Sequence, residues 1–430
     1  MNTRGLAFDE APPLMLVLRS FLLAPWFLAA SGVVLMIAGP TAWVDRYTPG
    51  LLAATHLVTI GFLTLTATAA VFQLVPVVAG VALPYAVVLL PVVRWGFAFG
   101  AVLLAAAFLG GWAVLFSLAA IPLALAAGAF TVSGMGALWR LPKHKTMTPM
   151  TYAILMLGAA LVMGLIMAGE RGALAPISAR LLDAHPLWAL AGGYFVLWAA
   201  VATQVLPMFQ GIRPWSARAP LALGPLVLSL LLAISAANAW AGGVVRAAPP
   251  VALAAVVVVV AVRTAHRLWT RTRRRADAMT VFWYMGLAGL AAAGMVGGLM
   301  AAGVPMGVKG PLVFGFLAIM GAAVSLMDGM LYKIVPFLVW LHLQRKPGAV
   351  HVLMSSAIGE RAIKAHVFVH AAVIALGLAA IGWPRALSEV AGAMWIADGA
   401  MLGANLIRAL IFYRRLSSRA AAGVLPHAAL

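Results

Sequence analysis

The chain of 430 residues contains no cysteine, and only 9% of its residues are charged. The lack of cysteine excludes disulfides, thiolate metal sites and iron–sulfur clusters. Only 10 residues are Asp or Glu, and the sequence has no nucleophile triad, no phosphate-binding glycine loop and no HExxH zinc motif. Catalysis without a cofactor is not expected from such a chain. Whether the protein is an enzyme stays open.

Hydrophobic residues make up 64% of the chain, which indicates a protein of the lipid bilayer. A spanning helix needs about 20 mostly apolar residues, and the apolar runs are too long and continuous for the strands of a β-barrel. We predict an all-α polytopic bundle, a single integral membrane domain over residues 1–430, with about 12 spans. These spans are 15–38, 51–77, 86–109, 112–138, 149–169, 186–210, 219–241, 249–268, 279–302, 309–340, 362–383 and 388–413.

The net charge of +19 is unevenly placed between the predicted spans. Twelve spans put both termini on one side, and 19 of the 29 Lys and Arg residues fall on that side, against six on the other. This bias predicts cytoplasmic termini and a multi-pass protein of the inner (plasma) membrane of a bacterial-type cell. Topology explains the charge, so nucleic acid is not a predicted partner. The first apolar run lacks a basic segment before it and is predicted to be a retained helix.

One helix pattern occurs three times, with Gly fifteen residues before a Pro at the helix end and a long polar residue three before that Pro. The steps between the Pro residues are 131 and 129 residues. Repeats at a fixed period fix an architecture. We therefore predict three pseudo-threefold groups of four helices, with repeat units 1–145, 146–275 and 276–430. The repeated segments are Gly61–Pro76, Gly192–Pro207 and Gly321–Pro336.

The polar residues of this repeat are Gln73, Gln204 and Lys333. A Pro leaves the carbonyl four residues earlier without a donor, and a nearby Gln or Lys can satisfy it. One interpretation is therefore a helix-end device. The other is that the three side chains converge near the cytoplasmic face and line a polar site, in which Lys333 breaks the symmetry.

Four charged side chains within the spans stand out, namely Arg94, Asp328, Lys333 and Asp398. Intramembrane charges are costly and usually face the bundle interior. Asp328 and Lys333 are five residues apart, about 140° around a helix, so each needs a partner on another helix. They form either static ion pairs or a proton or ion path through Asp328, with Lys333 and Arg94 as cationic neighbours.

Histidine supplies the candidate cofactor ligands. His56 and His185 lie near the outer ends of the second and sixth spans, at nearly matching places. His366 and His370 are four residues apart and share one face of the eleventh span. A single imidazole can ligate haem, and an i,i+4 pair can hold a metal. The alternative for each is a hydrogen-bonded core residue.

The stretch 53–61, AATHLVTIG, resembles the second helix of subunit I of the haem-copper oxidases. The same stretch continued to residue 80 is similar to NnrS-type membrane proteins, and 332–340, YKIVPFLVW, looks like a segment of uncharacterised bacterial relatives of both. The resemblance implies three arcs of four helices, with His56 as a haem ligand and haem or copper as cofactors. Only topology and these few segments carry it.

The departures from the oxidases concern the ligands of the oxygen-reducing centre. That family has copper-ligating His on helices six and seven and two haem-ligating His on helix ten. Here helix six has only His185, and helices seven and ten have none within their spans. Helix ten offers only softer ligands, Met320, Met327 and Met330. A complete oxygen reductase is therefore not expected.

Three functions stay open from the sequence. One is an oxidase-like protein that binds haem or copper in respiratory electron transfer, nitric-oxide response or metal handling, with respiratory or metal-handling membrane partners. The second is a cofactor-free transporter that uses a polar path near Asp328, Lys333 and Arg94. The third is a structural or assembly subunit. Transporter repeats are usually twofold or inverted, which favours the first over the second.

Overall fold

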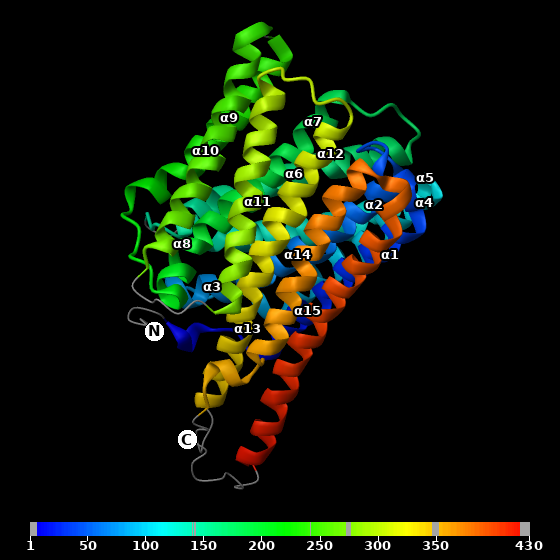
Figure 1. Cartoon of the computed structure of the whole chain (residues 1–430). Coiled ribbons are helices and arrows are strands. Elements are labelled where there is room, and N and C mark those ends of the chain that lie inside the picture. Colours follow the sequence, from blue (N-terminus) through cyan, green and yellow to red (C-terminus); the bar gives the residue numbers. More distant parts are fainter. Residues whose placement is uncertain are drawn as a thin grey trace.

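The computed structural model describes residues 7–139, 141, 143–240, 242–271, 277–345 and 352–421. These residues hold 12 helices long and apolar enough to cross a membrane (Figure 1) and no β-strand. The predicted all-α, multi-pass bundle is confirmed. The termini's side of the membrane stays a prediction.

Among the described residues, nine spans are α-helical over their apolar length and three are composite. The nine α-helical spans are α1 Leu14–Ala38, α4 Ala86–Gly110, α5 Ala113–Leu138, α6 Met147–Gly172, α9 Arg218–Trp240, α10 Gly243–Trp269, α11 Ala278–Ala301, α14 Glu360–Gly382 and α15 Pro384–Ala421. The composite spans are α2 Pro49–His56, η3 Leu57–Thr64 and α3 Leu65–Ala79; α7 Ala179–Leu187, η4 Trp188–Phe195 and α8 Val196–Gln210; and α12 Lys309–Phe316, η5 Leu317–Val324 and α13 Ser325–Gln344.

The centre of each composite span is a π-helix, and these are η3, η4 and η5. Their first residues are 131 and 129 positions apart, the same steps as between the repeated Pro residues. A π-helix is rare and is often found at functional sites. The repeat therefore extends to backbone geometry, whereas the threefold grouping of the four-helix units stays a prediction.

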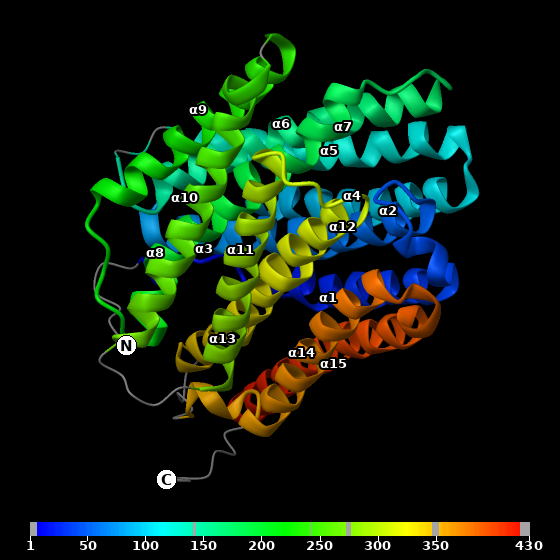
Figure 2. The ribbon, with the colours of Figure 1, turned by 45° about the horizontal axis from the view of Figure 1, so that its top comes forward.

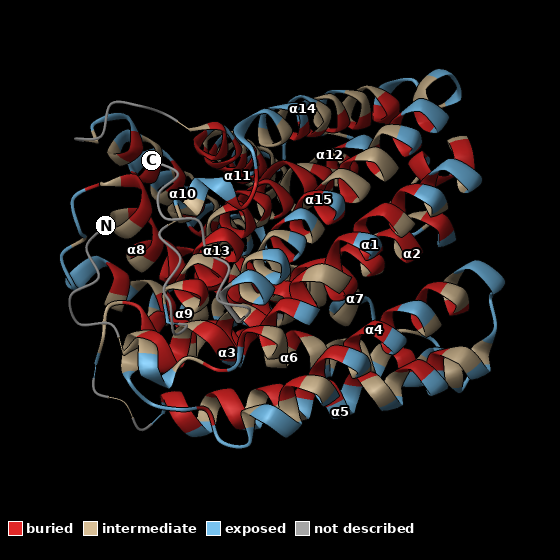
Figure 3. Ribbon diagram, turned by 90° about the horizontal axis from the view of Figure 1, so that it is seen from below, coloured by how far each residue is buried: buried red, intermediate tan, exposed pale blue. Residues whose placement is uncertain are grey.

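The three composite spans form the interior of the bundle. In the most apolar 18-residue stretch of each of these spans, 78%, 67% and 56% of the residues are buried. In every other span of the described part of the chain this share is 50% or less. Figure 3 shows the buried residues gathered on α3 and α13, with exposed residues on outer helices such as α5. In Figure 2, α15 runs beside α1, so the last span closes the bundle against the first.

Hydroxyl groups make additional hydrogen bonds to carbonyls of the π-helices. Thr64 Oγ1 and Tyr194 Oη both donate to the Thr59 carbonyl, at 2.8 and 2.6 Å. Tyr194 belongs to η4, so this contact also joins two of the inner spans. Ser325 Oγ lies 3.2 Å from the Met320 carbonyl, at the end of η5. The π-helices are thus held by specific polar contacts.

Several expectations about helix ends are wrong. The repeated helices do not end at Pro: α3 and α8 continue for three residues, and α13 runs on to Gln344. A Pro removes only one helical hydrogen bond, which packing against neighbouring helices offsets. The actual stops of α3 and α8 are Gly80 and Gly211, in the left-handed region at φ 66° and 68°.

The eighth span begins at 243 instead of 249, because α10 continues through Pro249 and Pro250 near its first turns. Both prolines lie beyond the first four residues of α10, so each removes one helical hydrogen bond, and neighbouring helices can offset this loss. The sixth span begins at 179 instead of 186 for the same reason, with Pro186 inside α7.

Candidate metal centre

A cluster of buried polar residues lies where α13, α14 and α15 meet. Three of its residues, Ser325, Asp328 and Tyr332, follow η5 at spacings that place them on one face of α13. The other elements contribute residues spaced by whole turns. The full cluster is Ser325, Asp328 and Tyr332 from α13, His366 and His370 from α14, and Asp398 and Asn405 from α15, all of them buried.

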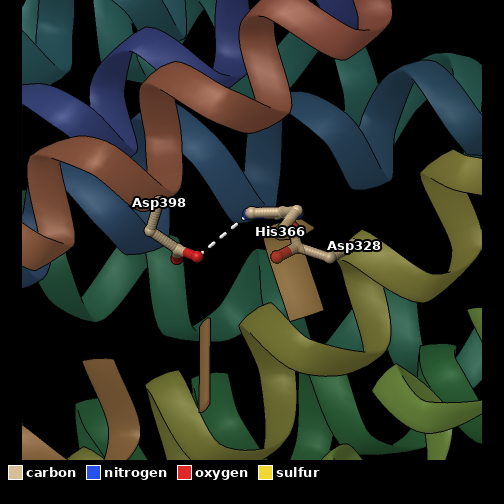
Figure 4. Close-up of side chains that lie close together, drawn as sticks. All are labelled: Asp328, His366 and Asp398. Atoms are coloured by element: carbon tan, nitrogen blue, oxygen red, sulfur yellow. Dashed lines mark hydrogen bonds and ion pairs between the residues drawn. The ribbon is translucent and has the colours of Figure 1, made fainter. Parts of the chain in front are cut away.

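Asp398 joins the two histidines. Its Oδ1 lies 2.9 Å from His366 Nε2 (Figure 4). The two oxygens of Asp398 lie 3.1 and 3.0 Å from His370 Nδ1. The other ring nitrogen of His370 lies 2.8 Å from Ser325 Oγ. Both imidazoles are therefore held at both nitrogens, since His366 Nδ1 also lies 2.9 Å from Tyr332 Oη.

A chain of hydrogen bonds sets the tautomer of His366. Arg408, exposed on α15, donates to Asn405 Oδ1 at 2.7 Å, and Asn405 Nδ2 donates to Tyr332 Oη at 2.8 Å. The Tyr332 hydroxyl is then free to donate to His366 Nδ1. This leaves the proton of a neutral His366 on Nε2, directed at Asp398.

Asp328 is the one incomplete member of the cluster. Both of its carboxylate oxygens are buried and have no hydrogen-bond partner among the described residues. Its Oδ2 lies 3.8 Å from His370 Nδ1, a nitrogen that is closer to Asp398, at 3.0 Å. A buried carboxylate without partners is costly and calls for a proton or a cation. Ligand atoms of Asp328, His366 and Asp398 all lie within 4.8 Å of one another, close enough to share one metal ion.

The cluster does not fit a haem. The Phe282 ring packs against both imidazoles, with centroids 5.2 Å from His366 and 5.5 Å from His370. No large cavity found among the described residues is lined by either histidine. A single ion needs no such space, so the donor set fits an ion and not a macrocycle.

His56 and His185 lie together at a second place. Their rings are nearly parallel, 13° apart, with centroids 6.4 Å apart. Each Nδ1 is next to a backbone carbonyl, His56 to Leu52 at 2.7 Å and His185 to Ala160 at 2.8 Å. Because a carbonyl only accepts, each Nδ1 carries its proton and leaves Nε2 as a free electron-pair donor. The pair predicted from sequence as cofactor ligands is thus brought together.

Among the described residues, Lys333 makes no hydrogen bond or ion pair with the cluster around Asp398 or with Gln73 and Gln204. Its Nζ donates to Asp277 Oδ2 at 2.6 Å. Asp277 caps α11 by accepting from the Thr280 N–H at 3.1 Å, and Thr280 Oγ1 and Arg271 both donate to Gln210. Burial raises the pKa of the Asp277 carboxyl, but the Lys333 ammonium and the hydrogen bonds from Thr280 lower it by more, so it ends below the usual 3.8.

We expect Asp277→Asn to lower the melting temperature of the detergent-solubilised protein at pH 7, and the deficit to disappear in acid. The depressed pKa makes the contribution of Asp277 complete above the unfolded-state value of about 4 and lost as pH falls through the folded-state value. Melting curves of both proteins between pH 7 and pH 3 test this. A deficit that stays constant down to pH 3 would show that the carboxylate charge is not involved. Asp183→Asn, which removes the carboxylate of an exposed ion pair with Arg46, is the control.

Gln73 and Gln204 line one small cavity of about 50 Å³ between α3, α8 and α13. The third helix presents Ile334 there and not Lys333. Gln73 Oε1 is buried without a hydrogen-bond partner among the described residues. The structure thus brings two of the three repeated polar residues together.

Arg94 is buried on α4 and donates to the Leu16 carbonyl of α1 at 3.2 Å. Lys333 faces α11, and Asp328 faces α14 and α15. Among the described residues, no hydrogen bond or ion pair connects these three charges directly. The structure therefore places the members of the expected polar path on different faces.

The sequence patterns pointed to the His366/His370 pair, to Asp328 and to Asp398 separately but did not join them, and they left out Ser325 and Tyr332 as members. A signal for these two was available. With Asp328 they stand at i, i+3 and i+7 on an apolar span, the spacing of a single helix face.

Comparison of the chain with protein-family models and with curated proteins finds no match.

Proposed function

We propose that this chain is a metal-handling membrane protein that holds one divalent transition-metal ion between Asp328, His366 and Asp398, with His370 beside them. One observation carries the proposal: the Asp328 carboxylate is buried without a hydrogen-bond partner among the described residues, and one of its oxygens lies within 4.8 Å of ligand atoms of His366 and Asp398. A cation supplies the missing interaction.

The donor set selects the class of metal. Imidazole and carboxylate together suit Zn²⁺, Mn²⁺, Fe²⁺ or Cu²⁺, whereas Ca²⁺ and Mg²⁺ prefer all-oxygen sites and Cu⁺ prefers sulfur. The charges also balance, since two carboxylates neutralise a divalent ion. Neutrality matters because an unbalanced charge within a low-dielectric bundle is strongly disfavoured.

The neighbouring side chains orient the ligands. Tyr332 and Ser325 contact the ring nitrogens of His366 and His370 that face away from Asp398. Such outer contacts fix the ring position and tautomer of metal-binding histidines. To ligate through Nε2, a neutral His366 must carry its proton on Nδ1, where Tyr332 Oη can accept it, so uptake of the metal is expected to switch the tautomer of His366.

Metal analysis of purified protein tests the site. After incubation with Zn²⁺ or Co²⁺ and removal of excess, we expect one tightly held ion per chain at this cluster. His366→Ala is expected to lose it, while His342→Ala, on α13 but bonded to its own helix, keeps it. Visible absorption of bound Co²⁺ should disappear in the same variant. Equal metal content in both variants would overturn the proposal.

A second candidate function is supported by the parallel rings of His56 and His185. Two free Nε2 atoms suit one copper ion, so we also propose a copper site here, on the oxidase-like pattern and with a role in electron transfer or copper supply. A haem fits less well, because the large cavity nearby is lined by Ala184 and Leu187 but by neither histidine. His56→Leu is expected to remove copper and leave the Zn²⁺ content unchanged.

The membrane placement belongs to the same proposal. Cytoplasmic termini, an inner-membrane location in a bacterial-type cell and respiratory or metal-handling partners follow from the charge bias and the resemblance. Two of the composite spans then carry His56 and His185 toward the outer side, and the third carries Asp328 deeper in the bilayer, where it meets α14 and α15.

A further inference from the structure

A large cavity lies between the inner spans and the α10–α11 pair, on the opposite face of α13 from the metal cluster. Its volume is about 970 Å³, at the upper end of the roughly 300–1,000 Å³ typical of small-molecule sites. Apolar side chains line most of it, including Met163, Trp188, Met327 and Met330. We name it the lateral cavity.

The lateral cavity is long. One of its walls runs from Ala179 at the start of α7 to Val201 in α8, which at 1.5 Å per residue is about 30 Å. The hydrocarbon core of a bilayer is about as thick. The depth therefore matches a long hydrocarbon chain better than a compact solute.

Polar groups are concentrated at the shallow end, where α7 and α10 begin. Arg180 and Arg246 line this end, and so does Asp183. Asp183 is already paired with Arg46 at 2.9 Å, whereas Arg246 donates only to the neutral amide of Asn238 at 3.1 Å. Arg180 makes no ion pair among the described residues. Two guanidinium groups without a protein anion thus stand at the mouth of an apolar cavity.

We infer that the lateral cavity binds a phosphate-headed lipid, with the phosphate at Arg180 and Arg246 and the hydrocarbon chain along the inner spans. Guanidinium groups bind phosphate through paired, charge-assisted hydrogen bonds. The apolar walls keep the lipid's hydrocarbon chain out of water, which favours its retention when the protein is washed with detergent. The site is separate from both proposed metal sites and does not depend on them.

Native mass spectrometry and phosphorus analysis of detergent-washed protein test this inference. We expect about one retained phosphate-headed lipid per chain, falling about tenfold or more in the double variant Arg180→Gln/Arg246→Gln. Ala318→Phe, which fills the cavity and keeps both arginines, is expected to cause a similar loss. Arg385→Gln, an exposed cation that does not line the cavity, is the matched control.

Each alternative outcome contradicts the inference in its own way. Loss in the arginine variant alone would mean surface attraction of lipid without the cavity. Displacement of the lipid by millimolar inorganic phosphate would mean that the headgroup binds without its chain. Unchanged lipid in both variants would exclude the site. Melting curves and metal content, expected to stay at the wild-type level, separate these outcomes from misfolding.

Discussion

Asp328→Asn is expected to lower metal affinity at least about 100-fold while leaving the shape of the cluster intact. Second-shell changes alone typically cost 10- to 100-fold, and this one removes a ligand charge. A divalent ion would then face only the carboxylate of Asp398, and the net charge would stay uncompensated within the bundle. Titration of the purified protein with Zn²⁺ against a competing chelator measures the change.

The same substitution should reverse its effect on stability when metal is withdrawn. In EDTA the wild-type protein has to bury the Asp328 carboxylate without a partner or protonate it, so the asparagine variant should melt at an equal or higher temperature. In Zn²⁺ the wild type gains stability by binding and should melt higher than the variant. Two melting curves that keep the same order in both conditions would argue against a metal. Asp183→Asn serves as the control.

The spans were predictable because they depend on one property, hydrophobicity over the bilayer thickness. The meeting of α13, α14 and α15 was not, because the rotation of each helix about its axis is set by packing. Spans that are apolar on all sides show little preferred face. His366 and His370 could be placed on one face of α14 by their spacing. Their partner Asp398 lies on another helix, 28 residues beyond His370, and spacing does not show that it faces them.

The repeated helix shows the same limit. The three spans that carry the pattern are also the three that contain the π-helices, and the π-helices follow its period. The direction of Lys333 could not be inferred, because its partner Asp277 follows a cluster of arginines that the charge bias had explained by topology alone. Lys333 on one span pairs with the N-cap residue of another span. Tertiary packing decides such a pairing, and it cannot be inferred from spacing along a single helix.

Replacing Gly289 with leucine is expected to prevent the bundle from folding around η5. Gly289 of α11 packs directly on the backbone of Gly321 within η5, where a Cβ would overlap the carbonyl carbon and oxygen of Gly321 and lie 2.8 Å from the Ala322 nitrogen. These are backbone atoms, so no side chain can turn away to relieve the clash. Overpacking of this kind costs about 3 kcal/mol or more. Separating α11 from η5 would also shift Asp328 and Phe282, so metal binding should be lost with the fold.

Size-exclusion profiles and melting curves of the detergent-extracted protein measure this effect, and other glycines supply graded controls. The three atoms that a Cβ at Gly61 would meet most closely all belong to the Phe27 side chain and none to a backbone, so Gly61→Ala should be milder than Gly289→Ala. A Cβ at Gly315 in α12 meets nothing within 4 Å, and Gly315→Ala should be neutral or stabilising by about 0.5–1 kcal/mol. Normal folding of Gly289→Leu would mean that α11 and η5 do not touch. The glycine at position 321 of the repeat would then need an explanation other than this close helix contact. The packing of α11 on η5 would also not be what directs Ser325 and Asp328 toward the histidines.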